Sequence, residues 1–246
     1  MVRTEQIMGM PITVEAVGAG AAAKVSIDEI FEYFRKIDAR YSTYKKDSEI
    51  SRINGGLARS GWSEEMRRIL ELCEQTKQET DGYFDINHNG QLDPSGLVKG
   101  WAINQAAGQL RATDIANFRI EAGGDIQAGG HNSQAKPWKI GIRNPFNRDE
   151  IIKVVEVSNQ GVATSGTAIR GQHIYNPHAP DKPITDIASL TVIGPDIYEA
   201  DRFATGAFAM GEQGIAFIES RPGLEGYMIK PDKTAVFTSG FERYAR

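Results

Sequence analysis

Apolar residues recur about every 3.6 positions in the first half of the chain, a spacing that predicts amphipathic helices. The three predicted helices are "SIDEIFEYFRKIDARY" (26–41), "SEEMRRILELCEQTKQET" (63–80) and "GWAINQAAGQLRA" (100–112). Ser26 and Glu29 form a capping-box pattern at the start of the first helix, and Ser63 is a capping residue for the second. A strand, "PITVEAV" (11–17), is predicted ahead of them.

In the second half the apolar runs become short and are interrupted by Gly, Asn and Pro, which is typical of strands joined by turns. The predicted strands lie in "FRIEAGGDIQAGG", "WKIGIRNP", "IIKVVEVSNQGVATSG" and "IASLTVIG". A helix capped by Asp196, a short helix through "GIAFIES" and a hairpin in "GYMIKPDKTAVFTSG" follow. Because helices and strands are segregated rather than alternating, we expect an α+β fold in one unit over residues 1–246.

The helix predicted after Asp196, "IYEADRFATGAFAMG" (197–211), has an unusual apolar face. At a period of 3.6 residues, Asp201 and Thr205 share the face of Ile197, Ala204 and Phe208. A buried carboxylate is costly unless it is paired, hydrogen-bonded or bound to a metal. Two interpretations stay open on this stretch alone: Asp201 bonds to a neighbouring loop, or it is a ligand.

Composition excludes several kinds of function. The chain is 40% hydrophobic and 24% charged with a net charge of −4, as in ordinary globular proteins, and it has no Lys/Arg run that would predict nucleic acid as a partner. No apolar run reaches the length of a membrane span, and the start lacks the order of a signal peptide. The sequence as written therefore predicts a cytoplasmic protein, with export through a segment absent from it as the alternative. Cys73, the only cysteine, can form no internal disulfide and falls on an apolar helix face, so we expect it in the core.

Three stretches could carry chemistry, and each has an ordinary alternative. "TDGYFDINHNGQLDPSGLVKG" (80–100) combines Asp, Gly and Lys, which suits an anion cradle or a metal, but it lacks Walker A spacing and could be a turn-rich loop. "EAGGDIQAGG" (121–130) is either a loop against a ligand or a tight strand crossing. "GVATSGTAIRGQHIYNPHAP" (161–180) holds His173 and His178, each a base or a hydrogen-bonded surface residue.

Eight pieces occur in order along nearly the whole chain: "MGM" (8–10), "YSTYKKDSEISRIN" (41–54), "TDGYFD" (80–85), "DPSGLVKG" (93–100), "EAGGD" (121–125), "ATSG" (163–166), "HIYNP" (173–177) and "ADRFAT" (200–205). In this order they resemble the ApbE family of FAD:protein FMN transferases. The resemblance implies a two-lobed α+β fold with FAD between the lobes. It also implies transfer of FMN from FAD to a Thr or Ser of an acceptor protein, with Mg²⁺ as cofactor and AMP as the leaving group.

The resemblance also implies roles for individual residues. Mg²⁺ would be held by the side chains of Asp201 and Thr205 and the backbone carbonyl of Gly96, which suits a hard cation that prefers oxygen ligands. His173 is the candidate general base for the attacking hydroxyl. The implied FAD contacts are Met8, Tyr44, Tyr83, Phe84, Asp85, Asp93, Lys99 and Tyr175. Of these, Lys99 would meet a phosphate, and a tyrosine ring would stack on the flavin or the adenine.

The sequence departs from the family pattern in three places. Asn176 stands where the family usually has Asp, Met10 stands where Thr is frequent, and "DPSG" replaces the commoner Gly-Ala form. Two other functions stay open. One is a Mg²⁺-dependent FAD pyrophosphatase, in which water replaces the acceptor hydroxyl. The other is a flavin-binding protein without turnover, against which the intact Asp201 and Thr205 pair argues.

Overall fold

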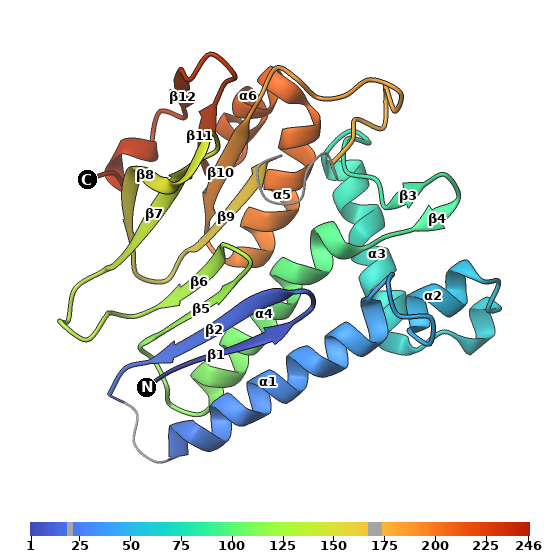
Figure 1. Cartoon of the computed structure of the whole chain (residues 1–246), viewed down its shortest axis with the longest axis horizontal. Coiled ribbons are helices and arrows are strands. Elements are labelled where there is room, and N and C mark those ends of the chain that lie inside the picture. The colour runs from blue at the N-terminus through green and yellow to red at the C-terminus, as the bar shows by residue number, and fades with distance from the viewer. Residues whose placement is uncertain (19–21, 167–173) are drawn as a thin grey trace.

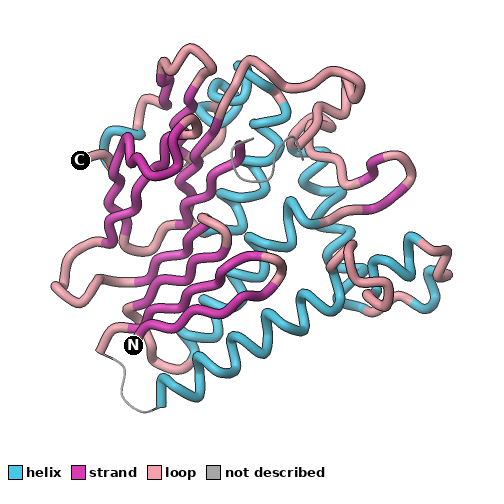
Figure 2. Tube along the Cα trace, viewed as in Figure 1, coloured by secondary structure: helices cyan, strands magenta, loops and turns pink. Residues whose placement is uncertain are grey.

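The centre of the fold is an antiparallel sheet of eight strands in the order β1-β2-β5-β6-β9-β10-β11-β12 (Figures 1 and 2). The computed structural model describes residues 1–18, 22–166 and 174–246. The strands of this sheet are β1 (Val2–Ile7), β2 (Met10–Ala16), β5 (Phe118–Ala122), β6 (Asp125–Gly129), β9 (Gly161–Gly166), β10 (Ser189–Gly194), β11 (Glu225–Ile229) and β12 (Ala235–Phe237). Two hairpins stand apart from it: β3 (Asn87–His88) with β4 (Gln91–Leu92), and β7 (Trp138–Asn144) with β8 (Asn147–Val157).

The helices gather on one face of the sheet, with α4 against β5 and β6 and α5 against β9 and β10 (Figure 1). They are α1 (Ala22–Tyr41), α2 (Glu49–Asn54), α3 (Glu64–Glu79), α4 (Ser95–Ala112), α5 (Ile197–Ala209) and α6 (Gly214–Glu219). Short 3₁₀ turns follow at η1 (Arg59–Gly61), η2 (Gly211–Gln213) and η3 (Phe241–Arg243).

Strand β10 is buried on both of its faces. Leu190 and Val192 belong to the main core under the helices, whereas Ile193 packs in a second cluster with Trp138 and Val155 of the β7–β8 hairpin. Since neighbouring residues of a strand point to opposite faces, this hairpin covers the side of the sheet that the helices leave open. The β-rich part of the fold is thereby fixed from both sides, and α5 rests on a rigid support.

The predicted α+β class and the predicted helix caps can now be compared with the structure. The α+β class is confirmed, and Ser63 and Asp196 cap α3 and α5, accepting hydrogen bonds from Met66 N at 3.1 Å and Glu199 N at 2.9 Å. The C-terminal hairpin is confirmed as β11–β12, and Cys73 is buried in the main core.

Three local predictions were wrong or incomplete. The first helix begins at Ala22, so Ser26 lies inside it and the predicted capping box does not form, because the alanines ahead of it are strong helix formers. Helix α4 begins at Ser95 rather than at residue 100, which makes part of the predicted turn-rich loop helical. Strand β1 and helix α2 were not predicted.

None of the helices in the described ranges combines the length and apolar character that a membrane crossing needs. The division into two lobes stays a prediction.

Candidate functional site

A cavity of about 1090 Å³ lies beside the first turn of α4. Its walls come from the loop after α3, the β3–β4 hairpin, β9 and the tip of the β7–β8 hairpin. Eight of the residues implied by the resemblance line it: Tyr83, Phe84, Asp85, Asp93, Gly96, Lys99, Tyr175 and Thr205. A cavity of this size is at the upper end of the range for small-molecule sites, so it can hold a ligand as large as a dinucleotide.

Asp201 lies behind this wall and is fixed by α4. Its side chain is 3% exposed, and its Oδ2 accepts a hydrogen bond from the backbone N–H of Gly100 at 2.8 Å. A Cβ on Gly100 would stand 2.6 Å from the Cβ of Asp201 and 2.8 Å from the carbonyl oxygen of Ile197. Only glycine therefore allows α4 and α5 to come close enough for this hydrogen bond.

The ammonium group of Lys99 lies between two buried carboxylates. It forms an ion pair with Asp125 and lies 3.4 Å from Oδ1 of Asp201. Burial raises the pKa of Asp201 above its usual range and the charge of Asp125 raises it further, while Lys99 and the Gly100 N–H oppose this shift. The site thus has two acidic groups that share one cation, which is how buried carboxylates are normally tolerated.

Asp125 was not among the predicted site residues. It is the first residue of β6, its side chain is 2% exposed, and its Oδ1 accepts a hydrogen bond from Thr164 N of β9 at 3.0 Å. The signal that could have identified it was the Asp in "EAGGD", a charged residue at the start of an apolar strand. The hydroxyl of Thr164 forms a hydrogen bond with the hydroxyl of Thr191, with 2.8 Å between the two oxygens.

Two of the three predicted metal ligands, Thr205 and Gly96, are in contact at the end of α4 nearest the cavity. The Thr205 hydroxyl donates to the Gly96 carbonyl at 3.5 Å, and Asp201 stands one turn before Thr205 on α5. The described residues include no group of three or more His, Cys, Asp or Glu side chains that could hold a metal. A metal here would depend on a mixed set of carboxylate, hydroxyl and carbonyl oxygens, a set that fits the preference of Mg²⁺.

Aromatic side chains form another part of the cavity wall. The Tyr175 hydroxyl donates to the carbonyls of Asp85 and Asn87, both at 3.0 Å, and its ring lies 4.4 Å from the ring of His88. On the loop after α3, the Tyr83 ring packs edge-on against the His178 ring, with 4.5 Å between the ring centroids. These contacts tie residues 174–178 to the loop after α3.

A hydrogen bond of the His178 ring to the loop after α3 indicates the role of this residue. Its Nε2 lies 2.8 Å from the carbonyl oxygen of Asp81, and Gly82, at a φ of +82°, leaves room for its ring. His178 is therefore a hydrogen-bonded residue on the surface, the ordinary alternative to a catalytic base. His173, the predicted base, lies outside the described residues.

Met8 and Tyr44 are not part of the cavity wall. Met8 lies in the β1–β2 turn with a φ of +56° and packs against the main core. Tyr44 is 97% exposed, although its neighbour Thr43 lines the cavity. Their predicted contacts with FAD stay predictions.

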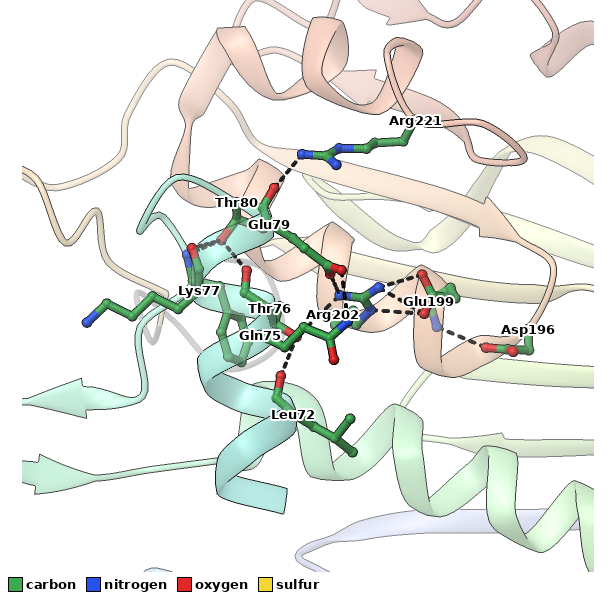
Figure 3. Close-up of polar contacts among 11 residues, drawn as sticks. Leu72, Gln75, Thr76, Lys77, Glu79, Thr80, Asp196, Glu199, Arg202 and Arg221 are labelled. Atoms are coloured by element: carbon green, nitrogen blue, oxygen red, sulfur yellow. Dashed lines mark hydrogen bonds and ion pairs between the residues drawn. The ribbon is translucent and has the colours of Figure 1, made fainter. Parts of the chain in front are cut away.

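A network of polar contacts joins α5 to the end of α3 (Figure 3). The buried guanidinium of Arg202, next to Asp201, forms ion pairs with Glu199 at 2.8 Å and with Glu79 at the end of α3. The Thr80 hydroxyl, one residue on, accepts from Phe84 N at 3.0 Å. Arg202 thus fixes α5 to the end of α3, and Thr80 fixes the cavity loop to the same point.

The chain matches the model of one protein family, described as the ApbE family, over residues 8–90 and 87–228. Among curated proteins, it is 24% identical to the FAD:protein FMN transferase of Haemophilus influenzae, covering 85% of this chain and 79% of that protein. It is 25% identical to the FAD:protein FMN transferase of Escherichia coli K12, covering 78% and 73%.

Solved structures share the fold. The flavin transferase ApbE from Vibrio cholerae superposes with a TM-score of 0.86 at 23% identity, covering 99% of this chain and 98% of that one. An ApbE protein from Thermotoga maritima gives a TM-score of 0.88 at 20% identity, covering 100% and 99%. The likeness therefore extends over the complete length of the structure.

Proposed function

The chain belongs to the ApbE family, and from this premise we propose that it is an FAD:protein FMN transferase. In the proposed reaction a Thr or Ser hydroxyl of an acceptor protein attacks the FMN phosphate of FAD. A bond forms between that oxygen and phosphorus, the bond to the bridging oxygen breaks, and AMP leaves with the electron pair. One observation carries the proposal: Gly96, Lys99 and Thr205 line one cavity wall with Asp201 directly behind them.

Asp201, Thr205 and the Gly96 carbonyl would hold Mg²⁺. When bound, Mg²⁺ would neutralise charge on the pyrophosphate oxygens. The protein's own contribution would be to present the three oxygens: α5 carries Asp201 and Thr205 one turn apart, and the first turn of α4 carries the Gly96 carbonyl.

The remaining residues would bind and orient FAD. Lys99 is 18% exposed and reaches the cavity, so its ammonium can meet a phosphate oxygen. The rings of Tyr83 and Tyr175, held by their contacts with His178 and His88, offer surfaces for the flavin or the adenine. His173 is the candidate acceptor of the hydroxyl proton.

The test uses Asp201→Asn, which keeps the shape of the side chain and removes its charge. The enzyme is incubated with FAD, Mg²⁺ and a candidate acceptor, and AMP release and flavin fluorescence on a denaturing gel are followed. We expect Asp201→Asn to abolish both signals, as EDTA should in the wild type. Asp196→Asn is the matched control on the same helix, since Asn caps a helix as well as Asp does.

Two outcomes would change the proposal. Undiminished AMP release by Asp201→Asn would remove Asp201 from the metal site. AMP release by the wild type with no fluorescent protein band, across all acceptors tried, would favour the pyrophosphatase.

A further inference from the structure

The ion pairs of Lys99 are unequal, although both of its partners are buried. Its ammonium contacts Asp125 directly but stands 3.4 Å from Asp201. The exposed fractions of the two carboxylate side chains are alike, at 2% and 3%, so burial does not explain the difference.

Asp125 is anchored independently of Lys99. Its Oδ1 accepts from the backbone of β9, through Thr164 N at 3.0 Å, and no substitution of the Thr164 side chain removes that donor. Its Oδ2 is buried and, apart from the ion pair with Lys99, has no hydrogen-bond partner among the described residues. Among the described residues this oxygen therefore faces Lys99, and the ion pair draws the ammonium toward Asp125.

The consequence concerns Asp201. An ammonium and a divalent cation compete for one carboxylate, because each needs the same oxygen lone pairs. We propose that Asp125 is a positioning residue that keeps Lys99 from closing fully onto Asp201, so that the Asp201 carboxylate stays available to a divalent cation. The proposal rests on the metal site of the proposed function. It assigns Asp125 no contact with the metal.

The alternative explanation is simple charge. Removing a negative group near a cation site weakens cation binding even if Lys99 does not move. The two explanations differ in what Lys99→Met does. If charge alone matters, Lys99→Met changes the affinity for the divalent cation by the same factor whether or not Asp125 is present. If Lys99 competes with the cation for Asp201, Lys99→Met changes that affinity by a larger factor when Asp125 is absent.

The experiment is a double-mutant cycle on the FAD-free full chain, with wild type, Asp125→Asn, Lys99→Met and the double variant. Mn²⁺ serves as the probe for Mg²⁺, because the electron paramagnetic resonance signal of free Mn²⁺ reports binding without turnover. We expect Asp125→Asn to weaken Mn²⁺ binding about tenfold, the size usual for coupled charged neighbours. Adding Lys99→Met should restore the affinity to at least that of the wild type.

The controls keep the outcomes separate. The positioning role is overturned if the change in Mn²⁺ affinity of the double variant is the product of the changes in the two single variants. It is also overturned if Asp125→Asn leaves the Mn²⁺ affinity unchanged. If Asp201→Asn leaves Mn²⁺ binding unchanged, the metal site of the proposed function is overturned instead. Asp125→Ser, which also removes the charge, is the second variant should Asp125→Asn fail to fold, and circular dichroism checks each protein.

Discussion

Gly100→Ala is the substitution whose effect the structure predicts most sharply. In an open helix this change stabilises, because Ala has a better helix propensity than Gly by about 1 kcal/mol. At Gly100 the added methyl would instead stand 2.6 Å from Asp201 Cβ and 2.8 Å from the Ile197 carbonyl oxygen. Neither neighbour is the free end of a flexible side chain, so α4 and α5 must move apart, and overpacking of this kind costs about 1–3 kcal/mol.

Gly108→Ala is the matched control. Gly108 lies on the same helix, is exposed, and has no atom within 4 Å of an added Cβ, so its substitution changes propensity alone. The propensity gain cancels between the two variants, which leaves the steric cost of about 1–3 kcal/mol as their difference. For a chain of this length that corresponds to a midpoint difference of about 2–12 °C in thermal unfolding.

The assay is unfolding of both variants, by heat and by urea, followed by circular dichroism. We expect Gly108→Ala to melt above the wild type and Gly100→Ala well below Gly108→Ala. FAD cleavage should fall only in Gly100→Ala, because the movement of α5 breaks the Gly100–Asp201 hydrogen bond. Equal melting temperatures for the two variants would refute the close approach of α4 and α5.

Three further predictions follow from other parts of the fold. Asp196→Ala should lower the free energy of unfolding by about 1 kcal/mol in urea titrations, through loss of the α5 cap, whereas Asp196→Asn should not. Burial raises the pKa of the Cys73 thiol to about 12, so a disulfide reagent should modify it only as fast as the protein unfolds; rapid modification of the folded protein would contradict its place in the core. His173→Ala should slow single-turnover FMN transfer by about 10²–10⁴-fold while FAD affinity, from flavin fluorescence, changes little; equal losses in both would leave His173 only a binding role.

Local signals in the sequence predicted the parts of the fold that depend on neighbouring residues. Ser63 and Asp196 were identified as caps because the bond they make is to a backbone N–H three residues on. The start of α4 was missed because Pro and Gly in "DPSG" indicate a turn. Pro94 in fact lies just before the first turn, where its missing N–H costs nothing, and Asp93 accepts from Ser95 N at 3.0 Å.

The site was predicted in part, for a different reason. Periodicity placed Asp201 and Thr205 on one buried face, but only the resemblance to a family assigned them to a metal together with Gly96. Neither the periodicity nor the resemblance predicted the pairing of Lys99 with Asp125. This ion pair joins the first turns of α4 to a strand that follows a Gly-Gly turn, and no spacing along the chain encodes such a contact. The second layer formed by β7–β8 was missed likewise, because a strand pattern does not say which face of a sheet it will cover.

The contact between Gly100 and Asp201 joins residues 101 positions apart, and this separation has a consequence during synthesis. At about 5–20 residues per second, the ribosome delivers Asp201 roughly 5–20 s after Gly100. Until then α4 has been synthesised, but α5, the helix that packs against Gly100, has not. The nascent chain is open to proteolysis or aggregation at α4 during this interval, and the pair of helices that makes the site can close only after α5 has been synthesised.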